Sequence, residues 1–286
     1  MTRRVALLGR PLKRRHSQVM HDAAFDAAGI DARYVLMELE PEAVEAAVAT
    51  ARANEEWLGL GVTAPYKRVV AGLCDAVEAE AEAIGAVNNV VRTDDGRLVG
   101  FNTDAPGFRA GVELAMGRPV AGAEVVVAGA GGAAHAVAFA CLQAGAARLT
   151  VANRDVSKAA ALLERFAGIG DGARAAVRLD DPAFAAAAAT ADLAVNATTV
   201  GMLDPGVTIP VDRLPGHATV FDLVYVPVET PLLAAARARG LRSANGSEML
   251  IAQAAIAFKR WTGVGGMADV MRAAVAPLLA DPTTTA

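Results

Sequence analysis

The chain has 286 residues, of which 54% are hydrophobic and 20% charged, a balance typical of a folded protein with a sizeable core. A formal net charge of −4 gives no basic excess for a polyanion, so we expect no nucleic-acid partner. No apolar run reaches the roughly 20 residues of a membrane-spanning helix, and the first residues are broken too early for a signal peptide. We therefore expect a cytoplasmic protein with no membrane partner, in which Cys74 and Cys141 form no disulfide.

Short apolar runs alternate with helical patterns along the first hundred residues. The patterns predict strands over residues 4–8, 34–39 and 57–62, and helices over residues 19–28 and 42–52. These elements make a first α/β domain. Turn-forming residues at 101–107 then separate a strand from a helix, and we place the domain junction there.

A second run of the same alternation begins at Ala123 and continues to about Gly240. The expected strands cover residues 124–128, 148–152, 192–196 and 219–223, with a helix over residues 133–144 after the first. Repeated βαβ units of this kind predict a doubly wound, Rossmann-type domain with a parallel sheet. The chain ends in two helices, over residues 249–261 and 267–279, which we expect to pack back on the first domain. The predicted division is residues 1–104 plus 246–286, and residues 105–245.

A glycine-rich turn follows the 124–128 strand and opens the next helix. It reads Gly129, Ala130, Gly131, Gly132, Ala133 and Ala134, which matches G-x-G-x-x-A in the context that a dinucleotide site requires. The first glycine permits the tight turn, the second lets the backbone approach a pyrophosphate, and Ala134 keeps helix and strand close. The second domain is therefore expected to bind a dinucleotide.

Arg154 stands at the end of the next strand, where an NAD enzyme usually presents Asp or Glu to the ribose. A guanidinium can pair with a 2′-phosphate and Lys158 adds charge one turn later, so the sequence favours NADP. The adjacent Asp155 is a negative group close to the expected phosphate. If Arg154 only lies solvated on a loop, the preference for NADP weakens.

Two loops after predicted strands carry ionisable groups, Lys67 in the first and Asp104 in the second. Oxidation of a secondary alcohol needs a group that takes the hydroxyl proton while hydride leaves for a nicotinamide. A Lys/Asp pair can do this. We treat the two residues as one proton-sharing unit and leave open which is the base.

These segments resemble the shikimate dehydrogenase family. Its hallmark V-T-x-P-x-K appears as V-T-A-P-Y-K at 62–67, followed by I-G-A-V-N at 84–88 and N-T-D-A-P-G at 102–107. Later segments agree as well: N-R at 153–154, N-A-T-T-V-G-M at 196–202, D-L-V-Y-V-P at 222–227 and M-L-I-A-Q-A-A at 249–255. The resemblance runs from about Val5 to Gly263.

The resemblance implies NADP-dependent, reversible reduction of 3-dehydroshikimate to shikimate, a small cyclic carboxylic acid, by a monomer or homodimer. The first domain would bind substrate and the second NADP. Lys67 and Asp104 would be the catalytic pair. The implied substrate contacts are Ser17, Arg15, Thr63, Asn88, Tyr225 and Gln253. The implied cofactor contacts, beyond the glycine-rich turn with Arg154 and Lys158, are Asn153, Thr198, Met202 and Gly246.

Three positions depart from the family pattern. The family places two serines on the substrate carboxylate, and an ungapped match puts Ser17 on the second and Arg15 on the first. Arg15 could supply a charge-assisted hydrogen bond instead, or belong to a solvated basic loop. Gly61 replaces a substrate-contacting asparagine, which removes a polar contact and leaves room. Glu248 replaces a glycine close to the nicotinamide.

These departures bear on the substrate more than on the reaction. Quinate or an amino analogue of shikimate is the alternative substrate, and a catalytically inert NADP-binding regulator is the alternative class of function. A folate dehydrogenase of related layout is a further alternative. Three residues at positions of the shikimate dehydrogenase pattern argue against it: Asn88, Tyr225 and Gln253. The four histidines are scattered without metal-ligand spacing, so we expect no metal site.

Overall fold

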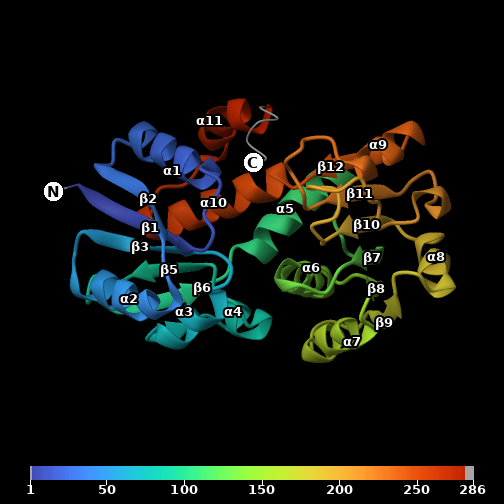
Figure 1. Cartoon of the computed structure of the whole chain (residues 1–286), viewed down its shortest axis with the longest axis horizontal. Helices are drawn as coiled ribbons and strands as arrows, with labels where there is room; N and C mark the ends of the chain where they lie inside the picture. Colours follow the sequence, from blue (N-terminus) through green and yellow to red (C-terminus); the bar gives the residue numbers. More distant parts are fainter. Residues whose placement is uncertain (1, 281–286) are drawn as a thin grey trace. The chain divides into compact units, whose positions relative to one another are not determined.

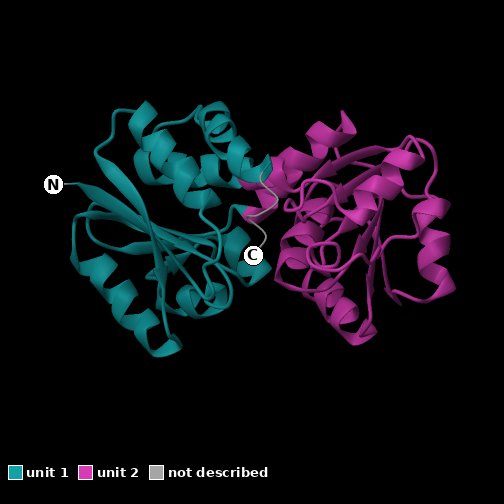
Figure 2. Ribbon diagram, turned by 45° about the horizontal axis from the view of Figure 1, so that its top comes forward, with its two compact units in different colours: residues 1–103, 251–281, 286 teal, residues 104–250, 282–285 magenta. Residues whose placement is uncertain are grey.

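Two β-sheets divide the chain into two units in the computed structural model, which describes residues 2–280. Within that range the first unit consists of residues 2–103 and 251–280, and the second of residues 104–250 (Figure 2). The expected division ended the first segment at 104 and began the last at 246, against 103 and 251 in the structure. The units are therefore each built on their own sheet.

The sheet of the first unit has the strand order β2-β1-β3-β5-β6-β4. Its strands are β1 (Arg3–Gly9), β2 (Ala32–Glu38), β3 (Trp57–Val62), β4 (Ala76–Val77), β5 (Asn89–Arg92) and β6 (Leu98–Phe101). The first three strands of the chain pair in parallel, whereas β5 pairs antiparallel with both β3 and β6. The hairpin turns at Asp95-Gly96, where Gly96 has φ +84°.

Helices cover both faces of this sheet (Figure 1). On one face lie α1 (His16–Ala27), α10 (Ser247–Thr262) and α11 (Ala268–Ala280). On the other lie α2 (Val44–Ala53), with η1 (Pro41–Ala43) before it, α3 (Lys67–Leu73) and α4 (Ala79–Ile84). Because α11 packs on α1, the expectation that the C-terminal helices return to the first unit is confirmed.

Strand β3 has two differently built faces. Leu60 and Val62 point into the apolar core beneath α2 and α3. Gly59 and Gly61, on the opposite face, make room for aromatic rings. A Cβ on Gly59 would overlap the Val90 carbonyl oxygen and lie 2.6 Å from the indole nitrogen of Trp261, which donates to that carbonyl at 2.9 Å. The indole therefore fits only because residue 59 has no side chain.

The second unit has an all-parallel sheet with the order β12-β11-β10-β7-β8-β9. Its strands are β7 (Glu124–Ala128), β8 (Arg148–Asn153), β9 (Ala173–Arg178), β10 (Leu193–Asn196), β11 (Thr219–Asp222) and β12 (Arg242–Asn245). Its helices are α5 (Asp104–Met116), α6 (Gly132–Gln143), α7 (Val156–Arg165), α8 (Pro182–Ala188), η2 (Val211–Arg213) and α9 (Pro231–Ala238). The strand order reverses between β7 and β10, so the predicted doubly wound fold is confirmed.

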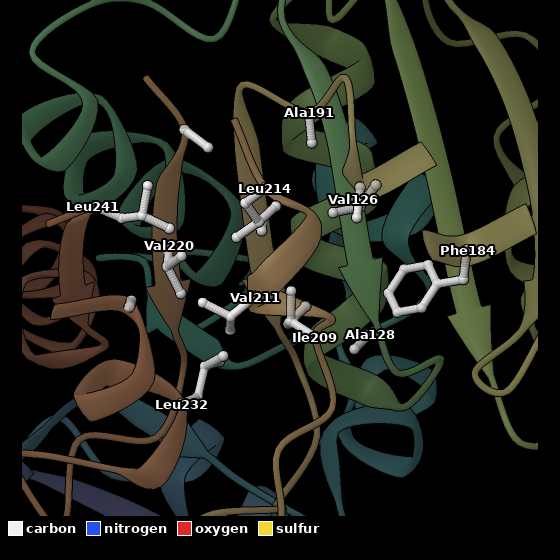
Figure 3. Close-up of a cluster of buried hydrophobic side chains, with 14 of the residues drawn as sticks. Val126, Ala128, Phe184, Ala191, Ile209, Val211, Leu214, Val220, Leu232 and Leu241 are labelled. Carbon is white, nitrogen blue, oxygen red and sulfur yellow. The ribbon is translucent and has the colours of Figure 1, made fainter. Parts of the chain in front are cut away.

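One face of this second sheet is buried by a cluster of small and branched side chains (Figure 3). Val126 and Val220 of the sheet meet Phe184 of α8 and Leu232 of α9. Parallel strands buried on both faces are expected to be apolar throughout. Among the described residues, no helix has both the length and the apolar character to cross a membrane.

Replacing Gly59 with Ala should lower the free energy of unfolding by about 1–3 kcal/mol, because the new methyl group forces apart β3, Val90 and Trp261. Urea denaturation measures this. The matched control is Gly72→Ala on the exposed side of α3, where a Cβ meets no atom within 4 Å. That variant should be neutral or more stable by up to about 1 kcal/mol. Equal effects of the two substitutions would contradict this account.

Candidate functional site

The glycine-rich turn exposes the N-terminus of α6. Gly129 has φ +111°, and a Cβ there would lie 2.9 Å from the Ala197 carbonyl oxygen, so only glycine fits. A Cβ on Gly131 or Gly132 would meet no atom within 4 Å, and both residues are exposed. Ala134 is fully buried between helix and sheet. The first amides of a 12-residue helix are thus accessible to an anion, as a pyrophosphate requires.

The cationic residues predicted to read the 2′-phosphate are exposed just beyond β8. Arg154 and Lys158 both lie in solvent. Asp155 is engaged elsewhere, because its carboxylate caps α7 and accepts from the Ser157 backbone N–H at 3.1 Å and hydroxyl at 2.6 Å. The hydroxyl hydrogen bond holds the pKa of Asp155 below its usual value. The Asp155 carboxylate, which is the negative group near the expected phosphate, therefore serves as the N-terminal cap of α7.

Asp222, at the end of β11, ties together the loops that follow two neighbouring strands. It is fully buried and accepts hydrogen bonds from the Thr230 hydroxyl at 2.6 Å, the Asn196 amide at 2.8 Å and the Val224 backbone N–H at 3.0 Å. Burial raises the pKa of Asp222, opposed by these donors. Asp222 stands within one of the family-like segments, but sequence reasoning assigned it no role.

Three predicted residues lie on the loops that Asp222 and Asn196 organise, namely Thr198, Met202 and Tyr225. Gly246 instead follows β12, and Asn153 ends β8, where its amide donates to the Asp155 carbonyl at 2.9 Å. The Thr198 hydroxyl donates to Asn196 Oδ1 at 2.7 Å. Met202 and Tyr225 are half-buried. Gly246 is buried, and a Cβ on it would overlap the Leu223 carbonyl oxygen. Gly246 is therefore required by packing against the chain after β11.

Glu248 belongs to the first turn of α10 and is half-buried. Close backbone approach occurs beside it: a Cβ on Gly111 of α5 would lie 2.9 Å from the backbone nitrogen of Met249 and 3.4 Å from the Glu248 carbonyl carbon. The absence of a side chain at residue 111 thus allows helix α5 to pack against the start of α10.

A network of amide and hydroxyl hydrogen bonds joins two predicted site residues of the first unit, Asn88 and Gln253, with Asn89 and Thr103. The Asn88 side-chain oxygen accepts from the Thr103 backbone N–H at 2.8 Å and from the Asn89 amide at 2.9 Å. The Thr103 hydroxyl accepts from the amides of Asn88 and Asn89 at 3.1 and 2.9 Å and donates to Gln253 Oε1 at 3.2 Å. Asn88 and Gln253 are thus brought together through Thr103, which the sequence did not single out.

Lys67 and Thr63 lie at the same end of the first sheet. The Lys67 carbonyl accepts from the Val87 N–H at 3.1 Å, next to Asn88, whose own carbonyl accepts from Val62 at 2.8 Å. The Lys67 side chain is half-buried at the start of α3. Asp104 follows Thr103 directly and begins α5. Three predicted residues of the first unit therefore lie around the carboxyl end of β3: Thr63, Lys67 and Asn88.

Arg15 and Ser17 lie at the N-terminus of α1. Arg15 is exposed, and its Nε donates to Gln18 Oε1 at 3.0 Å, while Gln18 donates to the Tyr34 carbonyl at 3.1 Å. The two terminal nitrogens of Arg15 have no hydrogen-bond partner among residues 2–280. Ser17 is half-buried in the first turn, where the helix favours an anion.

The expectation that Gly61 leaves room is wrong. A Cβ on Gly61 would overlap the hydroxyl oxygen of Tyr34, which reaches over from β2 across β1, and would lie 3.3 Å from Leu7 Cδ1. Tyr34 is 3% exposed. The space of the missing side chain is therefore filled, and by a polar atom. Sequence alone could not reveal this, because Tyr34 and Gly61 are brought together only by the strand order.

The Asp222 environment makes a pH-dependent prediction. Because burial raises the pKa of Asp222, the folded protein holds this proton more tightly than the unfolded chain, so stability is lost as pH rises through the folded pKa. Wild type should therefore lose stability relative to Asp222→Asn as pH is raised from about 4, by at most about 1.4 kcal/mol per pH unit, and then level off. Urea unfolding of both proteins across this range tests it. A gap that is constant or widens in favour of wild type would refute it.

The chain matches models of known protein families in three places. Residues 7–90 match the shikimate dehydrogenase substrate binding domain, residues 113–201 the shikimate / quinate 5-dehydrogenase family, and residues 246–276 the shikimate 5'-dehydrogenase C-terminal domain. A shikimate dehydrogenase (NADP(+)) of Symbiobacterium thermophilum is 42% identical over 97% of this chain and 95% of its own.

Solved structures are similar along nearly the whole chain. One is shikimate 5-dehydrogenase from Thermus thermophilus in complex with NADP(H) and shikimate, with a TM-score of 0.82, 37% identity, and coverage of 95% of this chain and 99% of that one. Another is quinate dehydrogenase from Corynebacterium glutamicum in complex with NAD, with a TM-score of 0.88, 34% identity and coverage of 96% and 99%. The chain belongs to the shikimate dehydrogenase family.

Proposed function

We propose that this protein catalyses the NADP-dependent, reversible reduction of 3-dehydroshikimate to shikimate. The observation that carries the proposal is that Thr103 bonds both Asn88 and Gln253 beside Lys67, because neutral amides held in this way suit a ring that bears several hydroxyl groups. The relative from Symbiobacterium has the name of this activity.

The second unit suits NADP. The open amides at Gly131 and Gly132 would hold the pyrophosphate, and Arg154 with Lys158 the 2′-phosphate. When bound, the cofactor exchanges a hydride with the substrate carbon. Asp155 stays charged in its helix cap, and the two cations Arg154 and Lys158 outweigh its single negative charge.

Lys67 and Asp104 form the proton-transfer pair in this proposal. In the oxidation direction the alcohol oxygen loses its proton to the pair, and in reduction the pair returns a proton to the forming alkoxide oxygen. The Asn88 side chain contributes by holding Thr103, so that the residue after it starts α5 at a fixed point. Ser17 and Arg15 are the proposed ligands of the substrate carboxylate, at a helix N-terminus that favours negative charge.

Quinate is the second candidate substrate, because a quinate dehydrogenase of known structure is 34% identical to this chain. Quinate has one more hydroxyl than shikimate and no ring double bond. The experiment is a turnover assay that follows absorbance at 340 nm, with shikimate and quinate each offered NADP and NAD. Fastest turnover of shikimate with NADP supports the proposal. Cofactor binding without any turnover would instead favour an inert regulator.

Removal of either member of the catalytic pair should reduce kcat for shikimate by about 10²–10⁴-fold, since general acid–base catalysis contributes about that much. The variants are Lys67→Met and Asp104→Asn, and NADP affinity should be retained in both. Arg68→Ala, at the exposed position after Lys67, is the matched control and should keep wild-type kcat. Either variant at wild-type kcat would remove that residue from the mechanism.

The Arg154→Ala variant should bind NADP at least tenfold more weakly and NAD with unchanged affinity, because only NADP has the 2′-phosphate. Fluorescence titration with each reduced cofactor measures the two dissociation constants. Arg165→Ala removes a guanidinium from the far end of α7 and serves as the charge control. Equal weakening of NADP and NAD in Arg154→Ala would show that the side chain does not read the phosphate.

A further inference from the structure

The Tyr34 side chain is held rigidly inside the first unit. Its ring stacks on His21 with centroids 4.5 Å apart and an interplanar angle of 19°, and the Trp261 ring lies 6.1 Å away. His21 is itself buried, and burial lowers its pKa to about 3, so it packs as a neutral ring. A ring fixed in this way places its hydroxyl at one point, over Gly61.

The hydroxyl at that point has no hydrogen-bond partner among residues 2–280, although the backbone groups of Tyr34 are paired with Asp22 and Gln18. Burial raises the pKa of the phenol, so it keeps its proton at neutral pH and can both donate and accept. The described protein gives this hydroxyl no hydrogen bond, and a phenylalanine would fill the same ring position. The polypeptide therefore gains no hydrogen bond from this oxygen.

The hydroxyl lies on the face of the sheet from which Asn89, a member of the polar network, also projects. Gly61 pairs with Asn89 in the antiparallel register of β3 and β5, and directly opposed residues project to the same face, with Cβ atoms about 4.5–5.5 Å apart. The Tyr34 oxygen stands close enough to the Cβ position of residue 61 to overlap an atom placed there. It therefore lies on the same face of the sheet as the Asn89 side chain, whose amide bonds Asn88 and Thr103.

We propose that the Tyr34 hydroxyl is a substrate-binding group that hydrogen-bonds a ring oxygen of the cyclic acid, and that Gly61 is kept small so that this hydroxyl can stand there. The inference rests on the proposed function. It makes the pair Tyr34 and Gly61 a determinant of substrate specificity: the phenol replaces the side chain that residue 61 lacks. A substrate with an oxygen at this point gains a hydrogen bond, and an analogue without it leaves the phenol unpaired.

Three variants test the pair: Tyr34→Phe, Gly61→Ala and the double substitution. Tyr34→Phe should lower kcat/KM for shikimate at least tenfold, mainly through a higher KM, with NADP affinity unchanged. Gly61→Ala should cause a similar loss, because its methyl group displaces the hydroxyl. Adding Gly61→Ala to Tyr34→Phe should cost nothing more, since the nearest remaining atoms are Leu7 Cδ1 at 3.3 Å and the ring carbon of residue 34 at 3.5 Å.

Unfolding separates binding from a structural role. Tyr34→Phe should keep or raise the urea midpoint, whereas the control Tyr66→Phe should lower it, because the Tyr66 hydroxyl donates to the Leu39 carbonyl at 2.5 Å. Wild-type kcat/KM in Tyr34→Phe, or a fall in its midpoint like that of the control, would overturn the inference and leave the proposed function intact. Failure of the wild type to turn over shikimate would overturn both.

Discussion

The carboxyl end of the first sheet depends on how Thr103 is held. Its hydroxyl accepts two amide hydrogens and donates its own, which is the full capacity of a hydroxyl, and its backbone N–H is bound by Asn88. Thr103 makes four hydrogen bonds and has no exposed surface, so it has little freedom to move. Asp104 follows Thr103 directly in the chain, so the residue before Asp104 is held by the protein itself, without a ligand. In the proposed mechanism such preorganisation would serve proton transfer.

Most of the architecture was predictable because it follows from local patterns. The β7 strand, the turn at Gly129 and helix α6 are adjacent in the chain, and glycine at a φ of +111° is required by the turn itself. Strand β9 and the β5–β6 hairpin were not individually predicted. The hairpin strands have only four residues each, and β9 is half-buried and rich in alanine and arginine, so their apolar signal is weak.

The candidate site was predictable where it is a motif and unpredictable where it is a tertiary contact. Asn88, Gln253 and Lys67 stand in recognisable segments. Tyr34 does not, because its contact with Gly61 crosses an intervening strand and depends on register. The same holds for the contact of Asp222 with Asn196, which joins two neighbouring strands 26 residues apart in the chain. Side-chain pairing at this range leaves no periodicity in a single sequence.

Glycine illustrates why residue type alone does not define a role. Gly59 is small to admit an indole, Gly131 has open space around its α-carbon, and Gly61 stands under a phenol that nothing in the described chain satisfies. The first arrangement stabilises the fold, because the indole gains a hydrogen bond. The other two give the fold no hydrogen bond: the amides of the exposed helix start are left to solvent, and the Tyr34 hydroxyl has no partner among residues 2–280. At the carboxyl ends of strands the fold leaves some polar groups without a hydrogen-bond partner in the protein. A ligand can gain the most binding energy there, because it supplies the missing hydrogen bonds.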